Sequence, residues 1–278
     1  MEKIEMSGGM RMTRRSVLCG ALLTATLAAT RSVLAQQMQT YLPQGIKAKP
    51  KGPLVFLDYD KDEIDLAYDQ APWAPNRGEI SKRNAQKSEA ALARLGPPRR
   101  LAYGSAEIEK LDIYMTKQTK APINIFIHGG AWRSGNAKGA AYMSETFVDA
   151  GAHFISLDFN NVTEVNGNLF IMAEQVRRAI AWVHKNASTF GGDSNRLYVS
   201  GTSSGAHLAA VALTTDWQMD FGLPADTLKG GLCCSGMYDL HPVSLSARAS
   251  YVKFTPEMIE KLSPQRHLGK LVAPVIVA

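Results

Sequence analysis

Cysteine is scarce in this chain of 278 residues, which has only Cys19, Cys233 and Cys234. The last two are adjacent in sequence, and adjacent residues of a strand point to opposite faces of a sheet. A disulfide framework and a cysteine-based metal site both need spaced cysteines, so the sequence excludes both. Histidine and acidic residues show no metal-ligand spacing either, and we predict no metal and no cofactor.

A strong charge of either sign is also lacking. The chain has 31 lysine and arginine residues against 25 aspartate and glutamate residues, a net charge of +6. Half of this excess lies in residues 1–35, which carry five basic and two acidic residues. The rest of the chain has no basic run with interleaved aromatic residues, so the composition argues against nucleic acid as a partner.

The apolar run near the N-terminus is too short for a comfortable membrane span. It covers Val17–Ala29, follows Arg14-Arg15 and precedes the small residues of Val33-Leu34-Ala35. This order predicts a secretory signal peptide in residues 1–35, and the paired arginines resemble a twin-arginine export signal. We expect export to the periplasm, with membrane contact only through this signal. An uncleaved membrane anchor is the alternative.

Residues 36–100 are predicted to form an N-terminal extension that covers the site like a lid. Within them, Ile80–Leu95 has a helical pattern that stops at Gly96-Pro97-Pro98. Trp73 and, further on, Trp132 are candidate walls of a substrate pocket, and a core role is equally open for both.

In residues 101–278 short apolar runs alternate with longer helical patterns. The predicted strands are 101–103, 110–115, 123–127, 153–159, 197–200, 230–235 and 274–278. The predicted helices are 139–150, 168–190, 204–214 and 256–262. This alternation predicts an α/β fold, a mainly parallel sheet with helices on both faces. Ligands of such sheets lie beyond the carboxyl ends of the strands.

A G-x-S-x-G pattern stands between a predicted strand and a predicted helix, as Gly201-Thr202-Ser203-Ser204-Gly205. In that setting a sharp turn holds the serine hydroxyl at the sheet edge, and the helix N-terminus behind it offers free N–H groups. We predict that Ser203 is a catalytic nucleophile. A solvent-facing serine in a tight turn is the alternative interpretation of the pattern.

A second pattern, His128-Gly129-Gly130-Ala131-Trp132, directly follows a predicted buried strand. Two glycines at this point free the backbone to direct N–H groups toward a developing oxyanion. The N–H of Ser204 would supply another donor. We expect His128 to orient this loop rather than to act as a base.

Both patterns, in this order, resemble the α/β-hydrolase superfamily, and most of all its branch of esterases and kynurenine formamidase-like arylformamidases. The resemblance runs from about Tyr59 to Ala278. It implies the α/β-hydrolase fold, Ser203 as nucleophile, and a small-molecule ester or amide as substrate. It also implies an oxyanion hole formed by the backbone N–H groups of Gly129, Gly130, Ala131 and Ser204. The oligomeric state stays open.

The same resemblance places the triad acid and histidine after the seventh and eighth strands of the sheet. The predicted strand 274–278 would be the seventh, so we expect a chain truncated before both groups and a sheet incomplete at its C-terminal end. Asp239, after the sixth strand, is the alternative acid. The leading interpretation is a serine carboxylesterase-like hydrolase with strongly impaired turnover. An arylformamidase and an inactive hydrolase-like binding protein are the alternatives.

Overall fold

The computed structural model describes residues 42, 43, 45–47 and 49–278. The predicted signal peptide, residues 1–35, lies outside the described residues. The chain divides into two units, residues 1–52 and residues 53–278. The described residues of the first unit form neither helix nor strand. The second unit contains the sheet and all the features discussed below, including the part of the predicted lid-like segment from residue 53 onward.

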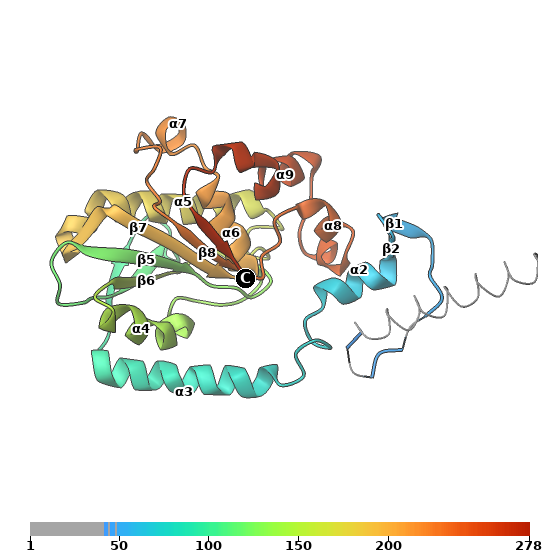
Figure 1. Ribbon diagram of the computed structural model, residues 1–278, viewed down its shortest axis with the longest axis horizontal. Coiled ribbons are helices and arrows are strands. Elements are labelled where there is room, and N and C mark those ends of the chain that lie inside the picture. The colour runs from blue at the N-terminus through green and yellow to red at the C-terminus, as the bar shows by residue number, and fades with distance from the viewer. Residues whose placement is uncertain (1–41, 44, 48) are drawn as a thin grey trace, which may run out of the picture. The chain divides into compact units, whose positions relative to one another are not determined.

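The second unit is built on a sheet whose described strands follow the order β3-β4-β6-β5-β7-β8-β9 (Figure 1). These strands are β3 (Arg99–Ala102), β4 (Lys110–Tyr114), β5 (Ala121–Ile127), β6 (His153–Leu157), β7 (Gly192–Thr202), β8 (Gly231–Cys234) and β9 (Val275–Val277). The strands from β6 to β9 in this order pair in parallel, and β3 and β4 add two antiparallel strands at one edge. The predicted mainly parallel sheet is confirmed.

Helices cover both faces of this sheet (Figure 1). One face carries α3 (Arg77–Leu95), the 3₁₀ helix η1 (Lys138–Met143) and α4 (Ser144–Asp149), and the other carries α5 (Leu169–Asn186) and α6 (Ser204–Leu213). Shorter elements complete the unit: the hairpin β1 (Leu54–Phe56) and β2 (Tyr59–Asp60), then α2 (Lys61–Tyr68), η2 (Ala187–Phe190), α7 (Trp217–Phe221), α8 (Leu240–Ser244), η3 (Ala247–Ser250), α9 (Pro256–Lys261) and η4 (Pro264–Lys270). No helix in the described part of the chain is long and apolar enough to cross a membrane.

The hydrophobic core lies on both sides of the central strands. Every residue of β6 is buried, as expected for a parallel strand that helices cover on both faces. The larger cluster packs beneath α5 and α6. The smaller one is aromatic, with Phe154 of β6 stacked against Phe126 at 6.0 Å and against Phe147 of α4 at 5.3 Å.

The predicted helix 139–150 is divided into the 3₁₀ helix η1 and the α-helix α4. The Tyr142 N–H donates to the Ser88 hydroxyl of α3 (3.1 Å). The Ala140 N–H donates to the Ala137 carbonyl, three residues back. The contact with α3 therefore takes a backbone donor that an α-helix would use.

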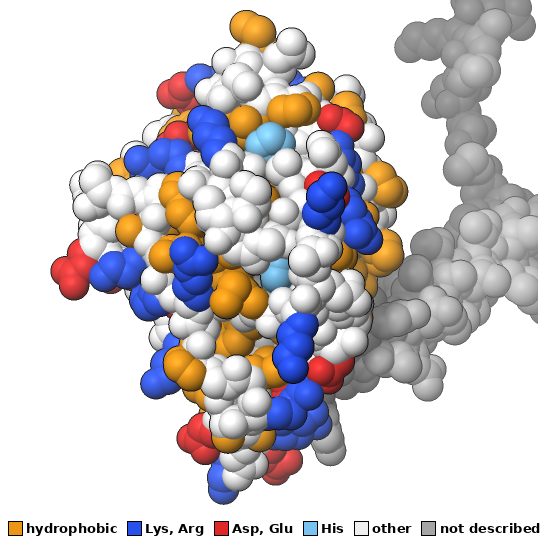
Figure 2. Space-filling model, turned by 90° about the vertical axis from the view of Figure 1, so that its left-hand side faces the viewer, with side chains coloured by type: hydrophobic (Ala, Val, Ile, Leu, Met, Phe, Trp, Pro, Cys, Tyr) orange, Lys and Arg blue, Asp and Glu red, His pale blue; other side chains and the backbone are white. Residues whose placement is uncertain are grey.

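The surface of the molecule mixes charged and apolar side chains. Figure 2 shows one face, on which the lysine and arginine side chains lie in several separate places with white and orange surface between them. Acidic side chains lie beside several of these groups. Charge on this face is therefore distributed and does not form one continuous basic patch.

The edge of the sheet at β3 and β4 depends on one arginine. Arg100 donates to Asp112 (2.7 Å) and to Asp158 (2.5 Å), two carboxylates that are 4% and 5% exposed. Asp158 also accepts from the Ala137 N–H (2.6 Å). Two buried carboxylates without a cation would be costly, and Arg100 offsets part of this cost by pairing with both.

We predict that Arg100→Met lowers the free energy of unfolding by about 2–3 kcal/mol, because it leaves two buried carboxylates without their cation. Arg94→Met is the matched control, since Arg94 pairs with Glu145 and Asp149 at the surface. Its cost should stay below about 1 kcal/mol. Urea unfolding of both variants measures the difference, and equal losses would contradict this role of Arg100.

Candidate active site

Ser203 occupies a sharp turn between the last residue of β7 and the first residue of α6. Its φ is 53° and its ψ −124°, a strained conformation for a residue with a side chain. The Ser203 N–H donates to the Cys234 carbonyl (2.7 Å), and the Ser203 carbonyl accepts from the His207 N–H (3.1 Å). These bonds hold the partly exposed serine at the carboxyl end of β7.

The glycines on either side of Ser203 allow close backbone packing. A Cβ on Gly205 would collide with the carbonyl oxygens of Ile127 and His128, at the end of β5. A Cβ on Gly201 would lie 2.5 Å from the Gly205 carbonyl oxygen. Only glycine lets the first turn of α6 pack so closely against β5 and β7.

The Gly129–Ala131 loop lies directly against this turn. A Cβ on Gly129 would be 2.7 Å from the Thr202 carbonyl oxygen and 3.3 Å from the Ser203 Cβ. The Trp132 N–H donates to the Ser204 hydroxyl (3.1 Å), which joins the loop to α6. The structure therefore brings Ser203 and Ser204 together with the two glycines and the alanine of the loop.

The backbone donors of this region are free. Within the described residues, the N–H groups of Gly130 and Ala131 donate no hydrogen bond to the protein. Ser204 is the first residue of α6, where an N–H has no acceptor within its own helix. Three unused donors beside a serine hydroxyl can stabilise negative charge on an oxygen atom bonded to that serine.

His207 is a buried residue of α6 that hydrogen bonds to Trp132, directly after the Gly129–Ala131 loop. Its Nδ1 accepts from the Trp132 indole N–H (3.3 Å), and its Nε2 donates to the Leu262 carbonyl (2.7 Å). Because the indole only donates and the carbonyl only accepts, the neutral imidazole with hydrogen on Nε2 is the form that fits. Complete burial lowers the pKa of His207 to about 4. The neutral ring joins the loop to the end of α9.

His128 lies at the start of the loop, with its ring stacked on Phe159 (4.3 Å between centroids). Its Nδ1 donates to the Gly129 carbonyl (2.9 Å), and its buried Nε2 has no partner among the described residues. Burial lowers the pKa of His128. The ring is neutral and contacts the loop backbone, not Ser203.

Gln70 covers the serine. Its amide nitrogen lies 3.5 Å from the Ser203 hydroxyl oxygen, the distance of a long hydrogen bond. Gln70 follows α2, and α2 is held in place by the Asp65 carboxylate, which accepts from the Ala247 N–H (2.6 Å), and by the Tyr68 carbonyl, which accepts from Arg248 (3.0 Å). An amide cannot accept a proton at neutral pH, so Gln70 is not a general base.

No histidine or carboxylate in the described part of the chain hydrogen bonds to the Ser203 hydroxyl. Asp239 caps α8 through the His241 N–H and pairs with Arg266 (3.1 Å). His267 contacts the Glu260 carbonyl, and His241 contacts Phe56. These groups have structural partners elsewhere in the fold.

The two candidate pocket walls differ in burial. Trp132 is 2% exposed and packs edge-on against His207 (5.3 Å), so it belongs to the core beneath the loop. Trp73 is 49% exposed and donates to the Leu66 carbonyl (2.9 Å). Of the two, Trp73 therefore presents more of its surface outside the core.

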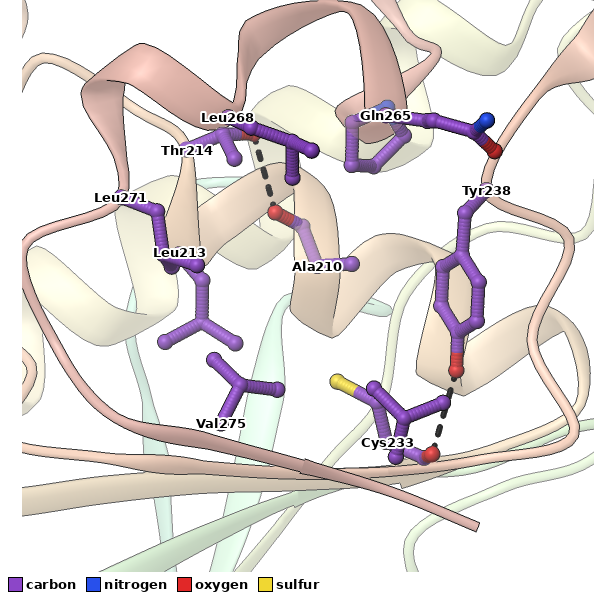
Figure 3. A pocket seen from close by; sticks show the side chains of 11 residues that line it. Ala210, Leu213, Thr214, Cys233, Tyr238, Gln265, Leu268, Leu271 and Val275 are labelled. Carbon is purple, nitrogen blue, oxygen red and sulfur yellow. Dashed lines mark hydrogen bonds between the residues drawn. The ribbon is translucent and has the colours of Figure 1, made fainter.

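Two cavities lie outside this site. One, of about 200 Å³, is almost wholly apolar and lies between α6, η4 and the strands β8 and β9 (Figure 3). Tyr238 lies at its border and donates to the Cys233 carbonyl (3.1 Å). The other, of about 470 Å³, lies next to Arg100, Asp112 and Asp158. Neither is lined by Ser203, so neither is assigned to the chemistry of the serine.

Gln70 and Arg248 are the site residues that the sequence patterns did not indicate. Gln70 meets Ser203 from 133 positions away, and Arg248 meets Tyr68 from 180 positions away. Neither belongs to a local motif, so only the tertiary structure places them.

No group of three or more histidine, cysteine, aspartate or glutamate residues in the described part could hold a metal ion.

The mainly parallel sheet with helices on both faces, and the strained serine turn from strand to helix, together define the α/β-hydrolase class. The model of the BD-FAE family matches residues 111–228. The chain is 31% identical over 223 residues to a kynurenine formamidase of Danio rerio, covering 76% of this chain and 72% of that protein. It is 34% identical over 179 residues to the esterase LipC of Mycobacterium tuberculosis, covering 61% and 44%.

A solved structure agrees with these sequence relatives. A putative thioesterase from Silicibacter sp. has a TM-score of 0.68 and 20% identity, covering 77% of this chain and 79% of that one. At this identity the similarity shows the fold alone. The 31% identity to the kynurenine formamidase, over 72% of that protein, shows that the chain belongs to the α/β-hydrolase family of kynurenine formamidases and esterases.

We predict that acid destabilises the protein through His207. The lowered pKa means that the unfolded chain takes up a proton that the folded chain excludes, so stability falls as the pH drops from 6.5 toward 4. This linkage amounts to about 3 kcal/mol. His207→Gln should be less stable at pH 7.5, with a shallower dependence on pH.

Urea unfolding of both proteins between pH 4 and pH 8 measures this dependence. The buried His128 and His153, whose pKa values are also lowered, are present in both proteins and cancel in the comparison. Equal slopes for the wild type and His207→Gln would show that the neutral His207 does not contribute to acid sensitivity.

Proposed function

We propose that this protein is a serine hydrolase that acts on small carboxylic esters, with Ser203 as the nucleophile. The observation that carries the proposal is the strained turn at Ser203 beside the unused N–H groups of Gly130, Ala131 and Ser204. A serine and preorganised backbone donors in one place are what acyl transfer requires.

In the proposed reaction the Ser203 hydroxyl oxygen attacks the ester carbonyl carbon and passes its proton to a solvent water molecule. The carbonyl oxygen becomes an oxyanion that accepts hydrogen bonds from Gly130, Ala131 and Ser204, and Gly129 gives the loop room to approach. The C–O bond to the alcohol then breaks, the alcohol takes up a proton from solvent water as it leaves, and the acyl group stays on Ser203. Water attacks the acyl-enzyme and releases the acid.

Proton transfer is the demanding part of this reaction. A serine hydroxyl at neutral pH needs an adjacent base, and the described residues around Ser203 offer the Gln70 amide rather than a histidine. We therefore propose that the 278-residue chain turns over slowly by itself. If turnover were absent altogether, the protein would be a hydrolase-like binding protein.

A second activity, hydrolysis of N-formyl aromatic amines, is favoured by one observation. The chain is 31% identical to a kynurenine formamidase across 72% of that protein. The same nucleophile and donors would serve, since a formamide also passes through a tetrahedral oxyanion. The export proposed from residues 1–35 would bring the enzyme to substrates outside the cytoplasm and so favours the ester.

We predict that an acetyl group accumulates on Ser203 when the 278-residue chain is incubated with p-nitrophenyl acetate. The activated ester can acylate the serine slowly, and deacylation lacks a base, so the acyl-enzyme persists. Mass spectrometry of digested protein locates the acetyl group. Steady-state turnover should be at least about 10³-fold below the 1–10³ s⁻¹ of typical enzymes.

Ser203→Ala is the control for this labelling and should lose the acetyl group from the peptide that contains position 203. Acetyl groups on lysines alone would contradict Ser203 as the nucleophile. A Ser203-dependent turnover within the ordinary enzyme range would contradict the slow reaction that we propose.

We predict that the ester is preferred over the formamide. The acylation of Ser203 by p-nitrophenyl acetate and its formylation by N-formylkynurenine are compared at equal concentrations, with Ser203→Ala subtracted. Faster formylation would make the protein an arylformamidase. No Ser203-dependent reaction with either compound would favour the hydrolase-like binding protein.

A further inference from the structure

The cavity of about 200 Å³ between α6, η4, β8 and β9 has a wall made mostly of aliphatic side chains (Figure 3). Leu213 of α6, Leu271 after η4 and Val275 of β9 contribute to this wall from three different segments. Among the described residues that line the cavity, none is charged. A ligand in this cavity therefore meets no ionic partner.

The two hydroxyl groups of the wall already have partners within the protein. The Thr214 hydroxyl donates to the Ala210 carbonyl (3.0 Å), one turn back in α6. The Tyr238 hydroxyl donates to the Cys233 carbonyl (3.1 Å) and accepts from the Gly236 N–H (3.2 Å), and Figure 3 shows the bonds of Thr214 and Tyr238 as dashed lines. Both hydroxyl protons are thus used and are not available to a polar ligand.

The Cys233 thiol also lines the cavity, and it is neutral. The residue is 1% exposed, and burial raises the pKa of its thiol to about 11. A protonated buried thiol packs like a small hydrophobic group and is only a weak hydrogen-bond donor. The thiol therefore adds to the apolar character of the wall.

The cavity has an opening, and its size limits what can enter. Leu268 of η4 is 58% exposed, and Gln265, also exposed, directs its amide away from Leu213 and Val275 (Figure 3). A small molecule can reach the cavity past these two side chains. An α-helix with its side chains is about 10 Å across, so a volume of this size cannot contain a helix of a partner protein.

We infer that this cavity is a binding site for one small uncharged hydrocarbon group, such as a single aromatic ring or a short alkyl chain. Dry apolar cavities of ~150 Å³ bind benzene, because such a ligand gains contacts and loses no hydrogen bonds. The site goes beyond the proposed function, since Ser203 does not line it and no bond to the ligand is broken.

The elements that form the wall are also the elements that hold the serine turn. Helix α6 begins at Ser204, and the Ser203 N–H donates to the carbonyl of Cys234, the last residue of β8 (2.7 Å). A ligand that packs between α6 and β8 binds the folded chain and not the unfolded one. Its binding is therefore expected to raise the temperature of unfolding.

Toluene and phenol form a matched pair of probes, because they have the same ring and differ by a methyl group in place of a hydroxyl. Isothermal titration calorimetry of the full chain measures both. We expect saturable binding of one toluene per chain, about tenfold tighter than phenol, whose hydroxyl finds no free partner in the cavity. At a concentration tenfold above its Kd, toluene should raise the unfolding temperature by about 3 °C.

Ala210→Leu tests the location, since Ala210 lines the cavity and a larger side chain there fills it. This variant should no longer bind toluene. Ala85→Leu is the matched control, because Ala85 is an exposed residue of α3, on the other face of the sheet, and it should bind toluene like the wild type.

Leu268→Asp is a second variant, at a side chain exposed enough for the fold to be retained, which circular dichroism verifies. It removes apolar surface from the opening and adds a charge, so toluene should bind about fivefold more weakly or less tightly still. Ser203→Ala should bind toluene with wild-type affinity, whether or not the serine is acylated by esters.

Three results would overturn the site. The first is equal affinity of the wild type for toluene and phenol, and the second is toluene binding that survives Ala210→Leu. The third is a concentration-dependent dimer in sedimentation velocity together with no binding of toluene, which would show that a second copy of the chain covers this surface.

Discussion

The close backbone contact between the serine turn and the end of β5 is the constraint on which the site depends. Gly205 has no side chain at the point where α6 meets the carbonyl groups of Ile127 and His128. Gly129 then lies against Thr202 and Ser203 in the same way. Because these contacts join two neighbouring parallel strands at their carboxyl ends, the serine and the loop of backbone donors have one relative position. A side chain at either glycine would separate the nucleophile from the donors.

Much of the fold follows from local patterns, and the parts that do not are explained by contacts. The buried strands β5 and β6 are apolar runs because helices cover both of their faces, and such runs are visible in the sequence. The short α2 also has a local signal in the sequence, since Asp60 and Glu63 form a capping box. The division of the predicted helix 139–150 had no local signal, and the Ser88 hydroxyl that the Tyr142 N–H contacts there is 54 positions away in the sequence.

The residues of the candidate site also fall into two groups, those that belong to local motifs and those that only the tertiary fold brings to the site. Ser203, Ser204 and the Gly129–Ala131 loop lie within two short motifs, so spacing alone indicated them. The covering residue Gln70 and the buried Arg248 reach the site across 133 and 180 positions of sequence, where no periodicity or motif connects the partners. His207 lies between these cases. Its place four residues after Ser203 is local, but its bonds to Trp132 and Leu262 span 75 and 55 positions.

The electrostatics of the site follow from which of these groups can change their charge. His207, directly beneath the loop, is neutral above about pH 4, so it adds no positive charge where an oxyanion would form. Attraction for negative charge then comes from the backbone N–H groups of the loop and from the N-terminus of α6. Attraction for an anion at this site therefore needs no ionised side chain, whereas activation of Ser203 depends on a base that the residues contacting its hydroxyl do not supply.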